Sequence, residues 1–300
     1  MSIRHQITLI LISLSAIFVT TSWLIEEFFI EPAFAALEIE SADKDLRRCV
    51  DALDAELESL TKLSGDWGAW DEAYQFAIGN STTFRSSNLI DETFTTADLD
   101  YLSIIKLDGE VLWSNGINSK TGQHYDVAPI DQILKRTMAE KIRFTTVDDS
   151  LSGLIPTSQG TMLIGVHPVV PSNRKGSPVG VVTMGRLLTT SRISDLASRT
   201  HLDVNFLNKD SAELTDSERR LLQVSGTGKC IESSEDGELV ALSSLKDIEG
   251  NTLVLVRLTI SRRIMQHGSI AARAAMWCSL GGALITALGT GMALRYRVVE

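Results

Sequence analysis

Cysteine and histidine are scarce in this sequence of 300 residues, which contains three cysteines and five histidines. It has no Cys-x-x-Cys pair, and no two histidines stand at metal-ligand spacing on one predicted helix or strand. Because zinc sites are built from such pairs, we expect no metal site. Cys49 and Cys230 remain available for a disulfide in an oxidising compartment, whereas Cys278 lies inside an apolar run.

Positive charge is also scarce, and the formal net charge at pH 7 is -10. Nucleic-acid-binding proteins neutralise phosphates with a basic stripe, which this sequence lacks, so we expect no nucleic-acid partner. Residues 225–229 resemble the end of a phosphate-binding loop, but Gln223 replaces its first glycine and Cys230 its metal-binding hydroxyl. We expect no catalytic residue and no cofactor. An acid–base pair of Asp66 and Asp71 is the hydrolase alternative.

Two long runs contain no charged residue, residues 7–25 and residues 274–294. Each is close to the roughly 20 residues that a helix needs to cross a bilayer. A cleaved signal peptide is the alternative for the first run, because Ala33-Phe34-Ala35 has the form of a cleavage site. That run is too long for a usual signal core, and three acids separate it from the site, so we expect an uncleaved helix.

Basic residues stand outside both runs, Arg4 before the first and Arg295 and Arg297 after the second. Positive residues favour the cytoplasmic side, so we expect a two-pass protein of the inner membrane with both termini cytoplasmic. The predicted segments are a cytoplasmic N-terminus (1–6), a first transmembrane helix (7–26), a long amphipathic helix (27–63), a periplasmic domain with a membrane-proximal extension (64–273), a second transmembrane helix (274–294) and a cytoplasmic juxtamembrane start (295–300).

Small residues recur at every fourth position of the second apolar run. This spacing predicts a face on which helix backbones approach closely, against the first span or against another copy of the chain. The face consists of Ala271, Ala275, Ser279, Ala283, Ala287 and Gly291.

An amphipathic helix is predicted between the first apolar run and the periplasmic domain. Leucine and valine repeat there in alternating steps of four and three, with charged residues on the other face. The stripe faces either a second subunit or its own domain, and the first alternative predicts a homodimer. Its members are Leu46, Val50, Leu53, Leu57 and Leu60.

The middle of the chain reads as an α+β domain built on an antiparallel sheet. Asp108-Gly109 between two apolar segments is typical of a tight hairpin. The segments 161–170 and 179–187 are almost continuously apolar, so we place them at the centre of the sheet. The predicted strands are 101–107, 110–114, 161–170, 179–187, 202–207, 229–233, 238–245 and 252–260, and the predicted helices are 129–140 and 191–199.

An aromatic and acidic segment, residues 66–76, joins the amphipathic helix to the strands. A helix beginning after Asp66 would place Trp67, Trp70 and Tyr74 on one face, with Asp66 as its cap and Asp71 beside the rings. Such a cluster either binds a polar or cationic small molecule or attaches the long helix to the sheet. Both alternatives remain open.

Two polar residues interrupt the apolar strands, His167 near the end of one and Arg186 near the end of its neighbour. If they point to one face, they would meet the polar end of a ligand, with Arg186 binding a carboxylate or phosphate. The alternative is that Arg186 pairs with a buried acid, for example one from the segment 66–71.

These features together resemble the fourth class of CHASE periplasmic sensor domains, over roughly residues 45–200. The Asp-Trp…Trp-Asp element is the most specific part of the resemblance. The matching residues are Asp66-Trp67, Trp70-Asp71 and Tyr74, Tyr101-Leu102-Ser103-Ile104-Ile105 running into Asp108-Gly109-Glu110-Val111, His167-Pro168, and Pro178-Val179-Gly180 leading to Gly185-Arg186.

The resemblance implies an extracytoplasmic sensor, related to the Cache and PAS-like folds, between two membrane helices. It further implies a HAMP linker and a cytoplasmic output module, such as a histidine kinase or a diguanylate cyclase. His167 stands where the family commonly has an arginine, which puts that polar contact in doubt. Only residues 295–300 follow the second apolar run, so we expect this chain to be the front part of a longer receptor.

Our main interpretation is therefore a membrane-anchored ligand sensor for signal transduction, not itself an enzyme. The expected ligand-binding residues are Asp66, Trp67, Trp70, Asp71, Tyr74, His167 and Arg186. A signal would leave through the strand 252–260 and the helix that follows it, for which Ser261 is the expected cap and Gly268 the one weak point. A scaffold that binds a protein partner is the alternative from a different class.

Overall fold

The computed structural model describes residues 3–140, 143–223, 228–233 and 238–297. It divides into two compact units. Unit 1 consists of Met1–Lys44, Ser233–Leu239 and Ile260–Glu300, and unit 2 of Asp45–Glu232 and Val240–Thr259. The predicted turns at residues 225–228 and 236–237 fall wholly or partly outside the described residues.

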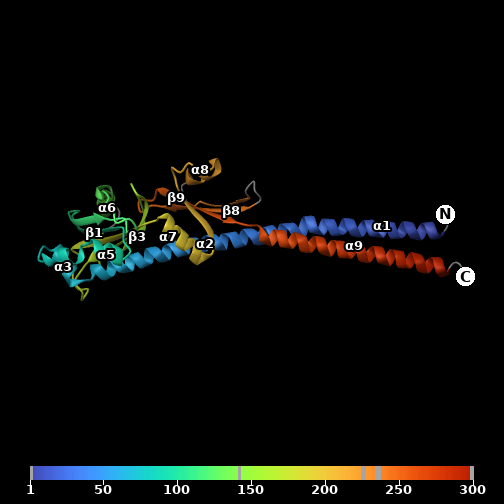
Figure 1. The fold of residues 1–300 in the computed structure, drawn as a ribbon, viewed down its shortest axis with the longest axis horizontal. Coiled ribbons are helices and arrows are strands. Elements are labelled where there is room, and N and C mark those ends of the chain that lie inside the picture. The colour runs from blue at the N-terminus through green and yellow to red at the C-terminus, as the bar shows by residue number, and fades with distance from the viewer. Residues whose placement is uncertain (1–2, 141–142, 224–227, 234–237, 298–300) are drawn as a thin grey trace. The chain divides into compact units, whose positions relative to one another are not determined.

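Unit 1 contains two long helical stretches. The first starts with α1 (Ile3–Ile25) and a π-helical turn, η1 (Glu26–Ile30), and continues into α2 (Glu31–Gly68), which extends into unit 2. Pro32 lies just after the π-helical turn, inside a helical stretch that is continuous from Ile3 to Gly68. The second stretch, α9 (Arg263–Arg297), is one unbroken helix that runs beside α1 (Figure 1). Two helical segments are long and apolar enough to cross a membrane.

The face of small residues that was predicted on α9 is exposed at every position whose side chain is described. An added Cβ on Gly291 would meet no atom within 4 Å, so α1 does not pack closely against this position. The side chains of Ala283 and Ala287 lie outside the described part of the structure. Packing of this face against another copy therefore stays a prediction.

The main sheet of unit 2 has five antiparallel strands in the order β2-β1-β5-β4-β3. The predicted central position of the two most apolar strands, β4 and β5, is confirmed. The strand bounds are Tyr101–Lys106 (β1), Val111–Gly116 (β2), Leu151–Thr157 (β3), Gly160–Val169 (β4) and Gly180–Leu187 (β5). β3 was not predicted from the sequence. Gly109 has φ +89°, as the tight turn between β1 and β2 requires.

A second sheet, in the order β6-β9-β8-β7, is formed by the later strands, where the sequence predicted only one sheet. Its strand bounds are Asp203–Asn208 (β6), Lys229–Ser233 (β7), Leu239–Lys246 (β8) and Thr252–Ile260 (β9). The remaining helices are α3 (Asp71–Ala77), α4 (Thr83–Asn88), α5 (Asp91–Thr96), α6 (Ala128–Glu140), α7 (Thr190–Thr200) and α8 (Asp216–Gln223). The α+β class is thus confirmed, with a long N-terminal helix and two antiparallel sheets.

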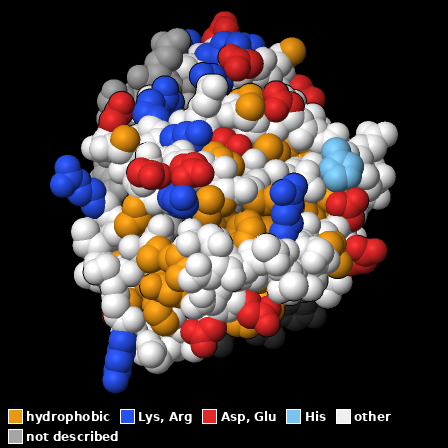
Figure 2. Space-filling view, turned by 90° about the vertical axis from the view of Figure 1, so that its left-hand side faces the viewer, with side chains coloured by type: hydrophobic (Ala, Val, Ile, Leu, Met, Phe, Trp, Pro, Cys, Tyr) orange, Lys and Arg blue, Asp and Glu red, His pale blue; other side chains and the backbone are white. Residues whose placement is uncertain are grey.

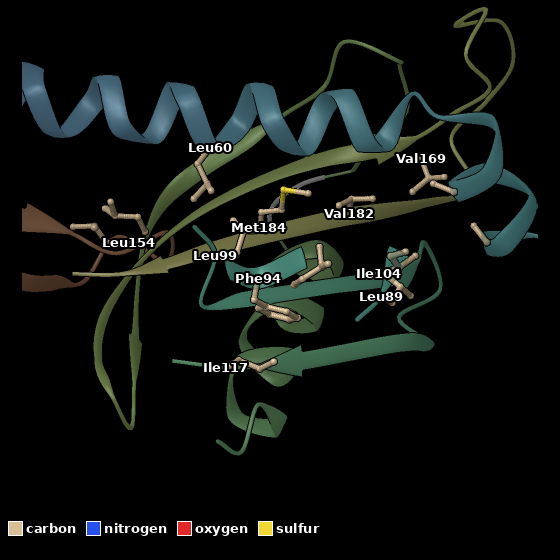
Figure 3. Packing of buried hydrophobic residues seen from close by; sticks show 14 of the residues in the cluster. Leu60, Leu89, Phe94, Leu99, Ile104, Ile117, Leu154, Val169, Val182 and Met184 are labelled. Atoms are coloured by element: carbon tan, nitrogen blue, oxygen red, sulfur yellow. The ribbon is translucent and has the colours of Figure 1, made fainter. Parts of the chain in front are cut away.

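Two hydrophobic clusters lie on opposite faces of the five-stranded sheet. Leu53 and Leu60 of α2 belong to the first, together with Met184 of β5, and Figure 3 shows Leu60 pointing from the helix toward Met184. Ile130 and Leu134 of α6 belong to the second. The leucine stripe of α2 therefore packs within its own domain, because Leu46, Leu53 and Leu60 are buried.

Candidate functional site

The aromatic segment lies at the junction of α2 and α3, and its helical geometry differs from the expectation. The helix does not begin after Asp66, because α2 continues through Gly68 and α3 begins only at Asp71. Asp66 is therefore not a cap, and Trp70, in an extended conformation, precedes α3. At this end of α2, an added Cβ on Gly68 would lie 2.4 Å from the Pro168 carbonyl oxygen, so the backbones of α2 and β4 are in close contact. The Gly68 carbonyl oxygen accepts from the Val170 amide at 2.8 Å.

An aromatic cluster forms around Phe84 of α4. Trp67 and Trp70 each meet the Phe84 ring edge-on, with ring centroids 6.3 and 5.8 Å away, and they meet each other at 5.9 Å. Edge-on contacts of this kind stabilise beyond the area that they bury. Trp67 and Tyr74 pack against the hydrophobic core, whereas Trp70 is 38% exposed. Figure 2 shows this end of unit 2, where hydrophobic side chains gather in patches among acidic and basic ones.

Asp71 binds the loop that follows β4. Its carboxylate accepts hydrogen bonds from the Ser172 amide at 2.8 Å and the Ser172 hydroxyl at 2.7 Å. These bonds favour the ionised form and lower the pKa of Asp71 below its usual range. Asp71 therefore fixes the position of a loop, in addition to any contact with a ligand.

His167 of β4 lies against the last turn of α2. An added Cβ on Gly65 would approach the His167 ring to 3.0 Å, so the ring would have to shift slightly to accommodate any larger residue. The Nδ1 of His167 is buried and has no hydrogen-bond partner in the described part of the chain. Burial, followed by the charge of Arg174, lowers the pKa of His167, so the ring is neutral at pH 7.

Arg186 of β5 is held by protein groups near the start of β1. It donates to the carbonyl oxygens of Asp98 at 2.9 Å and Ala97 at 3.3 Å, and it pairs with Glu56 of α2 at 3.4 Å. Glu56 also pairs with Arg199 of α7 at 2.6 Å. The suggested partner from the segment 66–71 is thus wrong, and the acid comes from α2 three turns earlier.

His167 and Arg186 share the face of the sheet that α2 covers, but the sheet does not bring them together. His167 pairs with Val182, whereas Arg186 pairs with Leu163. The two positions are therefore four residues apart along β4, about 13 Å along the strand.

A shallow groove along α2, of about 560 Å³, does bring two of the predicted residues together. Asp66 and Arg186 both line it. The other lining residues are Ala55, Glu58, Ser59, Lys62, Leu63 and Ala97. This groove therefore offers charges of both signs to a bound molecule.

Asp100 organises a buried polar network that the sequence did not indicate. Its carboxylate accepts from the amides of Leu187 and Ser119, both at 2.8 Å, and forms an ion pair with Arg192 of α7. Asp100 is 1% exposed, and a buried carboxylate needs such partners. The network links the ends of β2 and β5 to α7. The only available signal was an acid directly before an apolar strand.

A second arrangement missed from the sequence joins α2 to α9 within unit 1. The carboxylate of Glu38 accepts from Arg262 at 2.9 Å and from the Met265 amide at 2.8 Å, so it caps α9 from another helix. One turn away, an added Cβ on Gly268 would lie 2.6 Å from the Phe34 ring. We call these four residues, Glu38, Arg262, Phe34 and Gly268, the helix clasp. The predicted cap Ser261 lies two residues before α9 begins.

The described residues contain no group of three His, Cys, Asp or Glu side chains placed to hold a metal ion. Cys49 and Cys230 are both free thiols in this structure. Burial raises the pKa of Cys49 to about 11, so its thiol stays protonated and unreactive at pH 7.

The chain is similar to a known protein in sequence, to solved structures in fold, and to a family model. The chain is 26% identical over 221 residues to the methanogenesis regulatory histidine kinase FilI of Methanothrix harundinacea (strain 6Ac), a match that covers 72% of this chain and 24% of that protein. The chain thus spans about a quarter of the length of this relative.

Among solved structures, a domain of a sensory box/GGDEF family protein from Vibrio parahaemolyticus matches with TM-score 0.48 and 11% identity, covering 78% of this chain and 99% of that one. The periplasmic domain of Vibrio cholerae LuxQ matches with TM-score 0.42 and 13% identity, covering 74% and 97%. The model of the CHASE4 domain matches residues 52–207, more than half of the sequence. This chain therefore belongs to the CHASE4 domain family.

Proposed function

We propose that this protein is a membrane-anchored sensor that binds a small molecule outside the inner membrane and signals to a cytoplasmic output module. The observation that carries the proposal is the CHASE4 match over residues 52–207, on a unit whose chain enters and leaves through two long apolar helices. The output module, a histidine kinase or a diguanylate cyclase, would lie beyond residues 1–300, and the chain itself would perform no catalysis.

The proposed topology has two membrane passes, at residues 7–26 and 274–294, with residues 27–273 periplasmic. It is supported by exposed apolar side chains on both helices, such as Leu14 at 63% and Trp277 at 68%. Alkaline phosphatase and green fluorescent protein fusions after Thr200 and after Glu300 test it. Phosphatase activity should appear only at Thr200, and phosphatase activity at Glu300 would overturn the topology.

We place the ligand contacts at the end of unit 2 that carries α3 and along the groove beside it. The groove supplies Asp66 and Arg186, and Trp70 supplies an exposed ring. The other four predicted residues would support this site without contacting the ligand directly, because each is packed against or hydrogen-bonded to the protein. They are Trp67, Asp71, Tyr74 and His167. A ligand of both polar and apolar character suits this set.

The proposed signal path runs from β9 into α9. Only Ser261 and Arg262 separate the two elements, and α9 is stiff along its axis. A change in unit 2 would therefore move α9, and in a homodimer the exposed small face of α9 would contact the second copy.

Thermal unfolding of the full chain in lipid nanodiscs tests the ligand proposal. A small molecule that binds only the native state raises the midpoint by mass action. In a screen of small metabolites, we expect at least one compound to raise the midpoint in the natural protein and to raise it less in Asp66→Asn. Glu72→Gln, at an exposed acid outside the groove, is the matched control. A screen without any stabilising compound would contradict the proposal.

A further inference from the structure

A separate cavity lies in unit 2 between the β3–β4 turn and the end of β6. Its volume is about 530 Å³, within the range of 300–1,000 Å³ typical of small-molecule sites. It is lined by Pro156, Thr157, Gly160, Thr161, Phe206, Leu207, Asn208, Lys209, Asp210, Ser211, Glu213 and Leu253. None of these residues belongs to the groove beside α2.

The enclosed part of this cavity is uncharged. Thr161, Leu207 and Leu253 are buried and Phe206 is half-buried, whereas the three charged lining residues are all exposed. A charged ligand placed against these buried groups would lose its hydration without meeting a buried counter-charge. The cavity therefore favours a neutral ligand.

Hydrogen-bonding groups of both kinds converge on the same space. The Thr161 hydroxyl donates to the Asn208 side-chain oxygen at 2.9 Å, which leaves the Asn208 amide group without a partner in the described part of the chain. At the rim, the carboxylates of Asp210 and Glu213 are exposed and line the cavity. The site thus offers amide donors and carboxylate acceptors next to one another.

Apolar surface stands beside these polar groups. Phe206, Pro156 and Leu253 line the cavity, so a ligand would meet ring and aliphatic carbon on one side and polar groups on the other. Sugars and polyols match this pattern, because each hydroxyl both donates and accepts while the carbon skeleton presents C–H groups. We propose that the cavity between the β3–β4 turn and the end of β6 binds a neutral polyhydroxylated small molecule, a sugar or a polyol.

An occupant of this cavity would contact both sheets. Thr161 belongs to β4 of the five-stranded sheet, and Leu253 belongs to β9, which precedes α9. Binding would therefore favour one arrangement of the two sheets over others, in proportion to its differential affinity. The proposal concerns binding, so it stands or falls separately from the signalling role.

Isothermal titration and saturation-transfer NMR on the full chain in nanodiscs test the proposal. The probes are glucose, galactose, ribose, sucrose, sorbitol and myo-inositol, with the zwitterion glycine betaine and the dianion succinate as comparisons that carry charged groups. We expect saturable binding of at least one polyhydroxylated probe at millimolar concentration or below, and no binding of the two charged compounds.

Substitutions locate the site. Asn208→Ala should weaken that binding at least tenfold, and Phe206→Leu, which keeps apolar volume but removes the ring, at least threefold. Asn205→Ala is the matched control, because Asn205 is exposed on the same strand and does not line the cavity. Binding that survives Asn208→Ala but is lost in Asp66→Asn would place the ligand in the groove of α2 and overturn the proposal, as would preferential binding of betaine or succinate.

Discussion

Trp67 and Trp70 differ in burial although they are three residues apart. Trp67 packs against the hydrophobic core, and Trp70 is 38% exposed. We expect Trp67→Ala to lower the free energy of unfolding by about 3 kcal/mol, the lower end of the usual cost for a core aromatic residue, because Trp67 is partly buried. Trp70→Ala should cost less than half of that. Chemical unfolding followed by circular dichroism measures both, and equal costs would contradict the assignment of Trp67 to the core.

His167 makes the stability of unit 2 depend on pH. Its pKa in the folded state is below the unfolded value of about 6.5, chiefly because of burial. Between these two values the unfolded state binds more protons, so stability is complete above pH 6.5 and is lost as the pH falls through the folded pKa. Arg174, Asp148 and Asp149 are the nearby charges.

We expect His167→Asn to reduce the loss of stability between pH 7 and pH 5. His201→Asn is the matched control, because His201 is exposed and its φ of +56° suits asparagine. The measurement is the melting temperature of the natural protein, His167→Asn and His201→Asn between pH 7 and pH 5. The carboxyl groups of Asp71 and Asp149 titrate at lower pH and do not interfere, since hydrogen bonds lower the pKa of Asp149 to about 2. An unchanged pH profile in His167→Asn would count against a buried neutral ring.

The sequence showed which polar residues are unusual, but it did not show which residues they bind. The sequence marked Arg186 as a polar residue on an apolar strand, but its partner Glu56 lies 130 residues earlier and carries no local signal. Ser172, which binds Asp71, is likewise a loop residue 101 positions away. Such pairs form only when the tertiary fold brings distant segments together, so no short-range sequence pattern predicts them.

At the scale of the elements, the helix clasp holds α2 and α9 together within unit 1. Glu38 is 5% exposed and binds both Arg262 and the amide of Met265. Glu38→Gln removes the charge from this partly buried pair, and we expect it to cost about 1–2 kcal/mol and to change basal output. Glu40→Gln is the matched control on the same helix, because Glu40 forms only an exposed pair with Lys44.

The test uses this chain fused to a histidine kinase, with autophosphorylation as the readout. Basal activity should change in Glu38→Gln and stay as it was in Glu40→Gln. If both variants behave like the parent fusion, the clasp does not set the signalling state.

Gly268 supplies the second contact of the clasp. An alanine there would place its Cβ 2.6 Å from the Phe34 ring, so the ring or the helix must move. We expect Gly268→Ala to change the basal output of the same fusion, and Phe34→Ala in the same chain to restore it by making room. Gly282→Ala, with no atom within 4 Å of the added Cβ, is the control. Failure of the second substitution to restore output would show that the two residues act independently.

Elements with a long, regular pattern were predicted well. The continuous apolar runs of β4 and β5 were long enough to indicate buried strands, and the stripe of α2 had enough residues to define a helical period. The short helices α4 and α5, of six residues each, were not predicted from the sequence, because one or two turns are too short to show a period. The break between α2 and α3 was also misplaced, and it lies at the tertiary contact of Gly68 with the backbone of Pro168.

At the scale of the whole molecule, the chain consists of a CHASE4 sensor unit that is followed by one continuous helix. β9 ends at Ile260 and α9 runs unbroken from Arg263 to Arg297. Composition and the two uncharged runs were sufficient to predict the α+β class and two long apolar helices, because both are properties of long segments. The division of the strands into two sheets was not predictable, since strand order follows from tertiary pairing.

The most direct test of the central claim is the output of the kinase fusion as one to seven alanines are inserted after His267. Each inserted residue rotates the downstream helix by about 100° in a turn of 3.6 residues. We expect autophosphorylation to rise and fall with that period, so that seven insertions, close to two full turns, return it near the parent value. Output that stays constant, or that changes steadily with the number of insertions, would contradict transmission through a rigid helix.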